Sequence, residues 1–244
     1  MSKQPNIVNS RPAVTTAVRM AGEERRLQIL RVAVSLFSQR GFRGTTTKEI
    51  AQAAGVSEAM VFRHFATKEE LYKAILDHKA CAGVKWQEPR EMLADAINRL
   101  DDRAVFETLA FEALQHHEHD TEFQRLLLHS ALEEHDLAEM FWERTVLQVY
   151  ELLGSYIRER QRAGVFREVN PYIIVRAFLG MIIHHSLNNN LWDKQRNLLD
   201  ISNEQAAREF TEILLNGILA DRSENGGGAR RARASRVISK KKKR

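Results

Sequence analysis

Histidine, aspartate and glutamate are the side chains in this sequence whose chemistry suits a metal ion. Their densest run is residues 116–120, which read His-His-Glu-His-Asp. A metal-sensing site would need these groups to converge on one point, but adjacent positions on a helix point in different directions. Polar residues also belong at a helix end, where this run falls. We therefore expect no bound metal and no cofactor.

The motifs of the common enzyme classes are missing from the 244 residues. The sequence has no glycine-rich phosphate loop, no serine nucleophile elbow and no His-Glu-x-x-His or paired-cysteine signature. The single cysteine, Cys81, cannot form an intramolecular disulfide and indicates a reducing compartment. We expect a protein that is not an enzyme.

Composition favours a helical, soluble protein. Only four prolines and twelve glycines interrupt the chain, and 43% of its residues are hydrophobic. No apolar run approaches the roughly 18 residues that a membrane helix needs. These features predict a cytoplasmic protein that does not bind a membrane.

The net charge of +5 is unevenly distributed. Residues 222–244 contain ten Lys and Arg against one Glu, whereas residues 81–221 contain 14 basic and 24 acidic residues. A tail of glycines followed by like charges cannot pack, but it can bind phosphates through salt-sensitive electrostatics. Three interpretations of the tail stay open: an aid to DNA binding, contact with an anionic membrane surface, or no role of its own.

Local patterns predict the helices that would position a binding surface. Between residues 23 and 41, Leu27, Leu30, Val34 and Phe37 form one apolar stripe of a helix. Residues 46–49 form a capping box, Thr-Thr-Lys-Glu, that predicts a second helix start.

A short third helix should follow the second after a tight turn. Ser57 can cap this helix, and Gly55 can adopt the left-handed conformation that reverses the chain. Two short helices joined in this way are what a helix-turn-helix requires.

A longer string within residues 26–72 is more specific than this local pattern. It comprises Gly41-Phe42, Thr45-Thr46, residues 50–57 (Ile-Ala-Gln-Ala-Ala-Gly-Val-Ser), His64-Phe65 and residues 68–72 (Lys-Glu-Glu-Leu-Tyr). Together these motifs resemble the N-terminal DNA-binding domain of the TetR (tetracycline repressor) family. The resemblance implies an all-α fold, in which a three-helix helix-turn-helix domain precedes a larger all-helical ligand-binding and dimerisation domain. It also implies a homodimeric transcriptional repressor that a small-molecule effector releases from its operator.

The resemblance divides the chain into four parts. We expect a flexible N-terminal extension at 1–22, a DNA-binding domain at 23–83 (motif 46–65), an effector-binding and dimerisation domain at 84–221, and a disordered basic tail at 222–244.

The recognition helix should present short side chains and one guanidinium to the major groove. Arg63 can bind guanine bidentately, although a phosphate contact is an alternative. Glu58 can accept from cytosine, or it is simply a first-turn acid favoured by the helix dipole. The remaining residues of this surface are Ser57, Ala59 and Met60.

Phosphate contacts would hold this helix in place. The resemblance implies Thr46, His64 and Lys68 as donors, and Arg43, Thr47 and Lys48 lie near them in sequence. The family more often has tyrosine where this chain has Phe62, so the hydroxyl contact is lost there or replaced by Arg63.

The acidic body is expected to consist of amphipathic helices, including one over 89–115 and one over 136–163. By resemblance, residues 171–187 and 204–219 would pair with their twofold mates as a four-helix bundle. The operator would then be an inverted repeat. The alternative is that both segments are ordinary core helices of a monomer.

Aromatic and sulfur-containing side chains in the body could line an effector pocket for an apolar or aromatic small molecule, although plain core packing also accounts for them. The candidates are Phe106, Phe111, Phe123, Met140, Tyr150, Phe178 and Met181. The alternative function for the whole chain is a non-specific, basic-tailed DNA-compacting protein.

Overall fold

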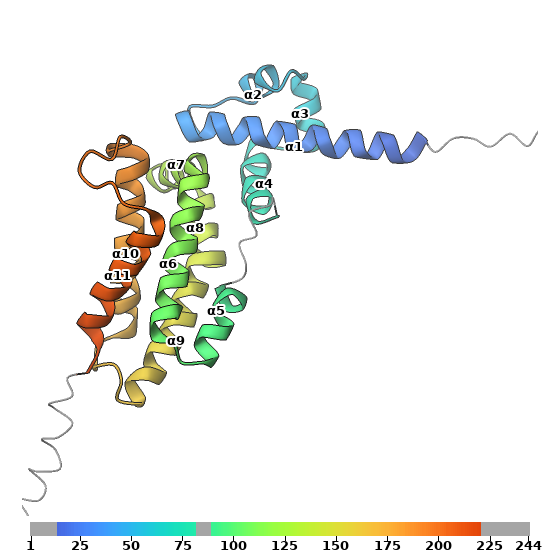
Figure 1. Cartoon of the computed structure of the whole chain (residues 1–244). Coiled ribbons are helices and arrows are strands. Elements are labelled where there is room, and N and C mark those ends of the chain that lie inside the picture. Colours follow the sequence, from blue (N-terminus) through green and yellow to red (C-terminus); the bar gives the residue numbers. More distant parts are fainter. Residues whose placement is uncertain (1–13, 82–88, 221–244) are drawn as a thin grey trace, which may run out of the picture. The chain divides into compact units, whose positions relative to one another are not determined.

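The computed structural model describes residues 14–81 and 89–220, and within them it confirms the all-α prediction (Figure 1). Apart from one isolated bridge between Phe166 and Leu219, the regular structure of these residues is helical. None of the helices described is long and apolar enough to cross a membrane. The predicted basic tail, 222–244, and residues 1–13 of the predicted extension lie outside the described residues.

The chain divides into two compact units that interleave in sequence. The first, here called the N-terminal unit, contains α1 (Val14–Arg40), α2 (Thr47–Ala53), α3 (Glu58–His64), α4 (Lys68–Cys81) and most of α7 (Thr121–Leu132). The second, here called the body, contains α5 (Pro89–Asn98), α6 (Asp102–His119), α9 (Leu147–Arg162), α10 (Pro171–Leu187) and α11 (Asn203–Ile218). Helix α8 (Asp136–Phe141) spans the boundary after Ala138.

Helix α1 supplies much of the core of the N-terminal unit. Leu30 and Phe37 are fully buried and Val34 nearly so, as the predicted stripe requires. The helix begins at Val14, however, so residues 14–22, expected in the flexible extension, are helical. No proline follows residue 12 in this part of the chain, so nothing stops the helix from extending toward the N-terminus.

Residues from three distant segments meet around one aromatic ring at the end of α1. Phe42 stacks on Phe37 at 5.8 Å and lies 5.0 Å from Tyr72 and 4.1 Å from His135, measured between ring centroids. The Glu133 carboxylate accepts a hydrogen bond of 2.8 Å from the Phe42 amide. We call these five residues the Phe42 cluster.

Burial within the Phe42 cluster changes its acid–base chemistry. It raises the pKa of the Tyr72 hydroxyl to about 12, and it lowers the pKa of the His135 ring below the usual histidine value. Both side chains are therefore favoured in their neutral forms at neutral pH. Outside the cluster, Lys73 and Asp136 form an ion pair of 3.2 Å that also joins α4 to the start of α8.

The body has its own core, in which α6 packs mainly against α11 and α5, and α10 packs against α9. Phe106 on α6 meets Phe178 on α10 edge to face at 5.2 Å, and both side chains are fully buried. At the start of α6, both Asp102 carboxylate oxygens accept hydrogen bonds of 2.8 Å from Arg160 on α9. Such bidentate, half-buried pairs are stronger than exposed ones and fix the two helices in register.

The prediction of a single helix over 89–115 is wrong, because the helix is interrupted between α5 and α6. Leu100 adopts a left-handed conformation with φ 53°, and the Asp101 side chain then caps α6 by accepting from the Ala104 amide at 3.0 Å. The helix expected over 136–163 does continue from α8 to α9, but it includes a π-helical turn, η1 (Trp142–Val146). A second π-helical turn, η2 (Asn188–Trp192), follows α10.

Replacement of Gly41 by alanine should destabilise the N-terminal unit by about 1–3 kcal/mol. Gly41 has φ +72°, and an added Cβ would overlap the Glu133 carboxylate. Chemical denaturation would measure the change in the free energy of unfolding.

Gly22→Ala is the matched control, because a Cβ there meets no atom within 4 Å. It should instead stabilise α1 by roughly 0.5–1 kcal/mol. If Gly41→Ala unfolds at the wild-type denaturant concentration, the packing described around Glu133 is wrong.

Candidate nucleic-acid interface

The turn between α2 and α3 has the geometry of a helix-turn-helix. Gly55 adopts φ +64°, and the Val56 amide donates to the Ala51 carbonyl at 2.9 Å, which closes the turn. The predicted caps on both sides are confirmed. Thr46 and Glu49 form a reciprocal capping box, and the Ser57 hydroxyl accepts from the Met60 amide.

The capping box also favours the ionised form of its carboxylate, Glu49. Hydrogen bonds from the Thr46 backbone and hydroxyl lower the pKa of Glu49, with a smaller contribution from Arg40. Arg40 lies 2.9 Å from the Glu49 carboxylate and so connects the last turn of α1 to α2. Glu49 is therefore ionised well below neutral pH.

Helix α3 turns one side to the core and the other to solvent. Val61 is 1% exposed and packs inward, whereas Phe62 is 46% exposed. Most of the predicted recognition surface lies on the solvent side: Ser57, Glu58, Ala59 and Arg63 are exposed, and Met60 and His64 are half-buried.

The residues predicted to contact phosphates lie on the elements that flank α3. Arg43, Thr46 and Lys48 are exposed, and Thr47 is half-buried. The Thr47 hydroxyl donates to the Glu58 carboxylate at 2.5 Å, which links the first residue of α2 to the first residue of α3. The spacing of these two residues in the sequence gave no sign of this bond.

Lys68 is less available for a phosphate contact than the sequence suggested. Its ammonium donates to the Phe42 carbonyl at 2.5 Å and sits 4.0 Å above the centre of the Phe42 ring. Partial burial lowers its pKa, which nearby carboxylates partly offset. Because an ammonium has three N–H groups, donors remain for a phosphate.

Two side chains that position this surface were missed at the sequence level. Gln28 on α1 donates to the Ala54 carbonyl at 3.0 Å and so fixes the end of α2. The Arg26 guanidinium lies 5.0 Å from the centre of the ring of Phe65, the residue that ends α3. A polar Gln28 between the apolar Leu27 and Ile29 was the one available signal for the first of these contacts.

The predicted effector residues differ in burial, and they do not all lie in the body. Phe106 and Phe178 are core residues in contact with each other, and Phe123 belongs to the N-terminal unit rather than to the body. Tyr150 is nearly buried and lies 5.6 Å from the Trp142 ring. The remaining candidates, Phe111, Met140 and Met181, are half-buried.

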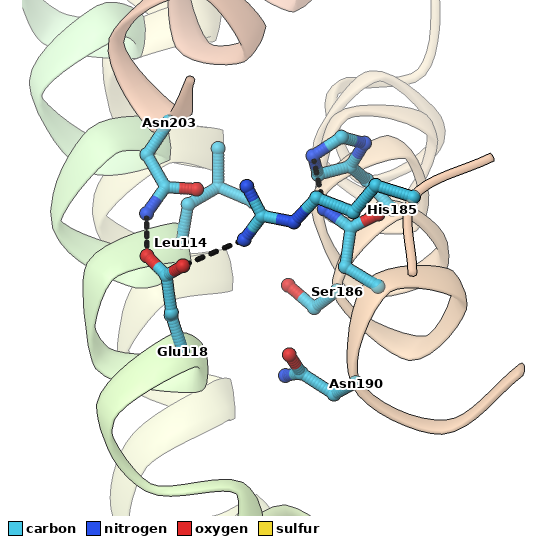
Figure 2. A pocket seen from close by; sticks show the side chains of 8 residues that line it. Leu114, Glu118, His185, Ser186, Asn190 and Asn203 are labelled. Atoms are coloured by element: carbon cyan, nitrogen blue, oxygen red, sulfur yellow. Dashed lines mark hydrogen bonds and ion pairs between the residues drawn. The ribbon is translucent and has the colours of Figure 1, made fainter. Parts of the chain in front are cut away.

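A small polar pocket lies elsewhere in the body, between α6, the end of α10 and the start of α11 (Figure 2). Its volume of about 10 Å³ is room for one water molecule. The Glu118 carboxylate accepts from Arg196 and from Asn203, each at 2.6 Å. The pocket is lined by Leu114, Glu118, His185, Ser186, Asn189, Asn190, Arg196 and Asn203, and includes none of the predicted effector residues.

The histidine run beside this pocket has a structural role. His117 shares a hydrogen bond of 2.9 Å with the Ser186 hydroxyl, and its carbonyl accepts from the Asn190 amide group. Burial lowers the pKa of His117 to about 4. Within residues 14–81 and 89–220, no group of three or more His, Cys, Asp or Glu side chains is arranged to hold a metal ion.

The buried His117 should make the protein less stable in acid. Its pKa is lower in the folded chain than in the unfolded chain, so between about pH 6.5 and pH 4 the unfolded state binds more protons. The free energy of unfolding should therefore decrease as the pH is lowered across this window, by at most about 1.4 kcal/mol per pH unit.

His117→Gln should reduce this loss when melting temperatures are compared at pH 7 and pH 5. His119→Gln, at an exposed position of the same run, should leave the loss unchanged. Equal pH profiles for all three proteins would contradict the assignment to His117.

The comparisons with known proteins agree with the geometry of the N-terminal unit. Residues 29–75 match the family model described as bacterial regulatory proteins, tetR family. The HTH-type transcriptional repressor KstR2 of Mycobacterium tuberculosis is 32% identical over 101 residues, which are 41% of this chain and 50% of KstR2. The match thus spans about half the length of that relative.

Two further matches extend over most of the chain. The HTH-type transcriptional regulatory protein RaaS of Mycobacterium tuberculosis is 27% identical over 202 residues, covering 80% of this chain and 87% of RaaS. The crystal structure of AibR in complex with isovaleryl coenzyme A and operator DNA superposes with a TM-score of 0.58. The superposition covers 78% of this chain and 98% of the AibR chain at 20% sequence identity, so this likeness shows the fold alone. Residues 29–75 thus form a DNA-binding domain of the type found in the TetR family of bacterial regulatory proteins.

Proposed function

We propose that this protein is a cytoplasmic transcriptional repressor that binds an inverted-repeat operator as a homodimer and leaves it when a small-molecule effector binds. The main support is the exposed face of α3, which a helix-turn-helix presents within a domain of the TetR family. KstR2, with which this chain shares that domain, is a transcriptional repressor.

In this proposal α3 enters the major groove and its flanking elements bind the backbone. Arg63 contacts a guanine, while Ala59, Met60 and Phe62 contact thymine methyl groups or sugars. Phosphates are bound by Arg43, Lys48, Ser57, His64 and Lys68, whereas the hydroxyls of Thr46 and Thr47 already donate to Glu49 and Glu58. Because Lys68 also bonds to Phe42, its phosphate contact would tie the DNA to the Phe42 cluster.

The proposed dimer forms through the exposed sides of α10 and α11. Ile173 and Ile213 are 61% and 62% exposed, and Ile183 is 44% exposed. Gly180 and Gly217 lie on the same two helices, and a Cβ at either position would meet no atom within 4 Å, which leaves room for a closely packed partner. A twofold axis there would set the spacing of two recognition helices at about 34–36 Å.

Ile213→Glu should convert the dimer to a monomer, because each copy would bury a carboxylate against apolar surface. Sedimentation equilibrium measures the mass directly, and operator affinity should fall at least tenfold since two half-sites are no longer held together. Leu198→Glu is the control: Leu198 is 88% exposed but lies outside 171–187 and 204–219, so this variant should stay dimeric. A dimeric Ile213→Glu protein would move the interface elsewhere.

The proposed effector is a small apolar or aromatic molecule that binds in the body. Phe106 and Phe178 are fully buried, so an effector that reaches them must displace core contacts. Entry would begin at the half-buried Phe111, Met140 and Met181 and continue toward Tyr150. Induction requires the effector to bind the DNA-free conformation more tightly than the operator-bound one.

Selection of bound duplexes from a random DNA pool tests the proposal. The full chain and a version ending at Ala220 should both select the same inverted repeat. If binding is sequence-neutral and disappears with the tail, the protein is instead a non-specific DNA-compacting protein and the repressor proposal fails.

Arg63→Ala should remove the base preference at one position in each half-site of the selected repeat. A bidentate contact to guanine contributes roughly 1–3 kcal/mol of discrimination, so affinity for the selected repeat should fall by about 5- to 150-fold. Arg103→Ala removes an exposed arginine of the body and should bind as wild type does. An Arg63→Ala protein that loses affinity equally for all sequences would make Arg63 a phosphate contact.

A further inference from the structure

Glu58 is the one acidic residue among the predicted DNA contacts. It is exposed at the first position of α3, in a group whose other charged members, Arg43, Lys48, Arg63 and Lys68, are basic. A carboxylate close to phosphates would weaken binding to every DNA sequence. An acid on this face must therefore either be a purely structural group or bind a hydrogen-bond donor that only some base pairs offer.

The contact with Thr47 fixes the Glu58 carboxylate in space. The Thr47 hydroxyl donates to Oε1 at 2.5 Å, and among the described residues no second hydrogen-bond donor reaches this carboxylate. An ionised carboxylate accepts through both oxygens, so Oε2 stays available. Because Thr47 restrains the side chain before DNA arrives, less conformational entropy is lost when Oε2 makes a contact.

The chemistry of base edges in the major groove selects the partner. Cytosine presents the N4 amino group as a donor, whereas guanine and thymine present acceptors that repel a carboxylate. Adenine presents the N6 amino group beside the N7 acceptor, so a carboxylate there gains one hydrogen bond and faces one repulsion. Cytosine is thus the base that best matches Glu58.

We propose that Glu58, positioned by Thr47, selects a cytosine in each half-site by accepting a hydrogen bond from its N4 amino group. This inference rests on the proposed function, and it names a base that the bound DNA must contain. Thr47 acts as a positioning residue in it, because its hydroxyl orients the carboxylate.

The test is selection from a random DNA pool with the full-length wild type, Glu58→Ala, Glu58→Gln and Thr47→Val. The wild type should select an inverted repeat with a cytosine that Glu58→Ala no longer requires. Glu58→Gln should shift this one position toward adenine, because a carboxamide pairs with the N6 and N7 edge. Thr47→Val should keep the cytosine but weaken the preference.

Competition binding then gives the size of the effect. Replacing the selected cytosine by thymine in one half-site should weaken wild-type binding by roughly 5- to 150-fold. The same replacement should change the affinity of Glu58→Ala less than twofold. A purely structural role for the Thr47–Glu58 bond would lower affinity for both duplexes alike and leave the base preference intact.

The outcomes separate this inference from the proposed function. If the wild type selects a repeat and Glu58→Ala selects the same repeat with the same cytosine, Glu58 does not contact a base and only the inference is overturned. If the wild type selects no repeat, the repressor proposal and this inference fail together. Glu58→Gln, which nearly keeps the shape of the side chain, guards against a loss of folding in Glu58→Ala.

Discussion

The hydrogen bond from the Phe42 amide to the Glu133 carboxylate is the constraint on which the N-terminal unit depends. It fixes the left-handed turn at Gly41, where α1 ends, against a segment that lies far along the chain. The same turn directs the Phe42 carbonyl to Lys68, and the hydrogen bond between them holds the start of α4. One carboxylate thereby holds the turn that ends α1, and this turn supplies the carbonyl that Lys68 binds at the start of α4.

The local structure of the DNA-binding helices could be predicted from sequence because caps act over three or four residues. The capping box at Thr46 and the cap at Ser57 are confirmed, as is the turn at Gly55. The break at Leu100 was missed, since a leucine in the left-handed region gives no compositional signal. The π-helical turns η1 and η2 likewise have no simple sequence signature.

The parts of the candidate site that depend on tertiary contacts could not be predicted. Thr47 and Glu58 were both selected as DNA contacts, but their bond forms only once α2 and α3 pack together. Lys68 was predicted as a phosphate donor, but its contact with the Phe42 ring depends on the turn at Gly41 and Phe42, whose geometry the sequence does not show. In the body, aromatic side chains alone do not distinguish a pocket from a core, because both bury the same residue types.

Most of helix α7 and the turn after it belong to the N-terminal unit, although residues 82–120 separate α7 from α4. A hybrid regulator made by joining two relatives near residue 83 would thus take Phe37, Phe42 and Tyr72 from one parent and the α7 segment from the other. Glu133 and His135 would then be replaced by residues that evolved beside different partners. Exchange of DNA-binding specificity between relatives of this chain should therefore transfer residues 122–138 together with the first 83, so that the grafted unit keeps its own packing.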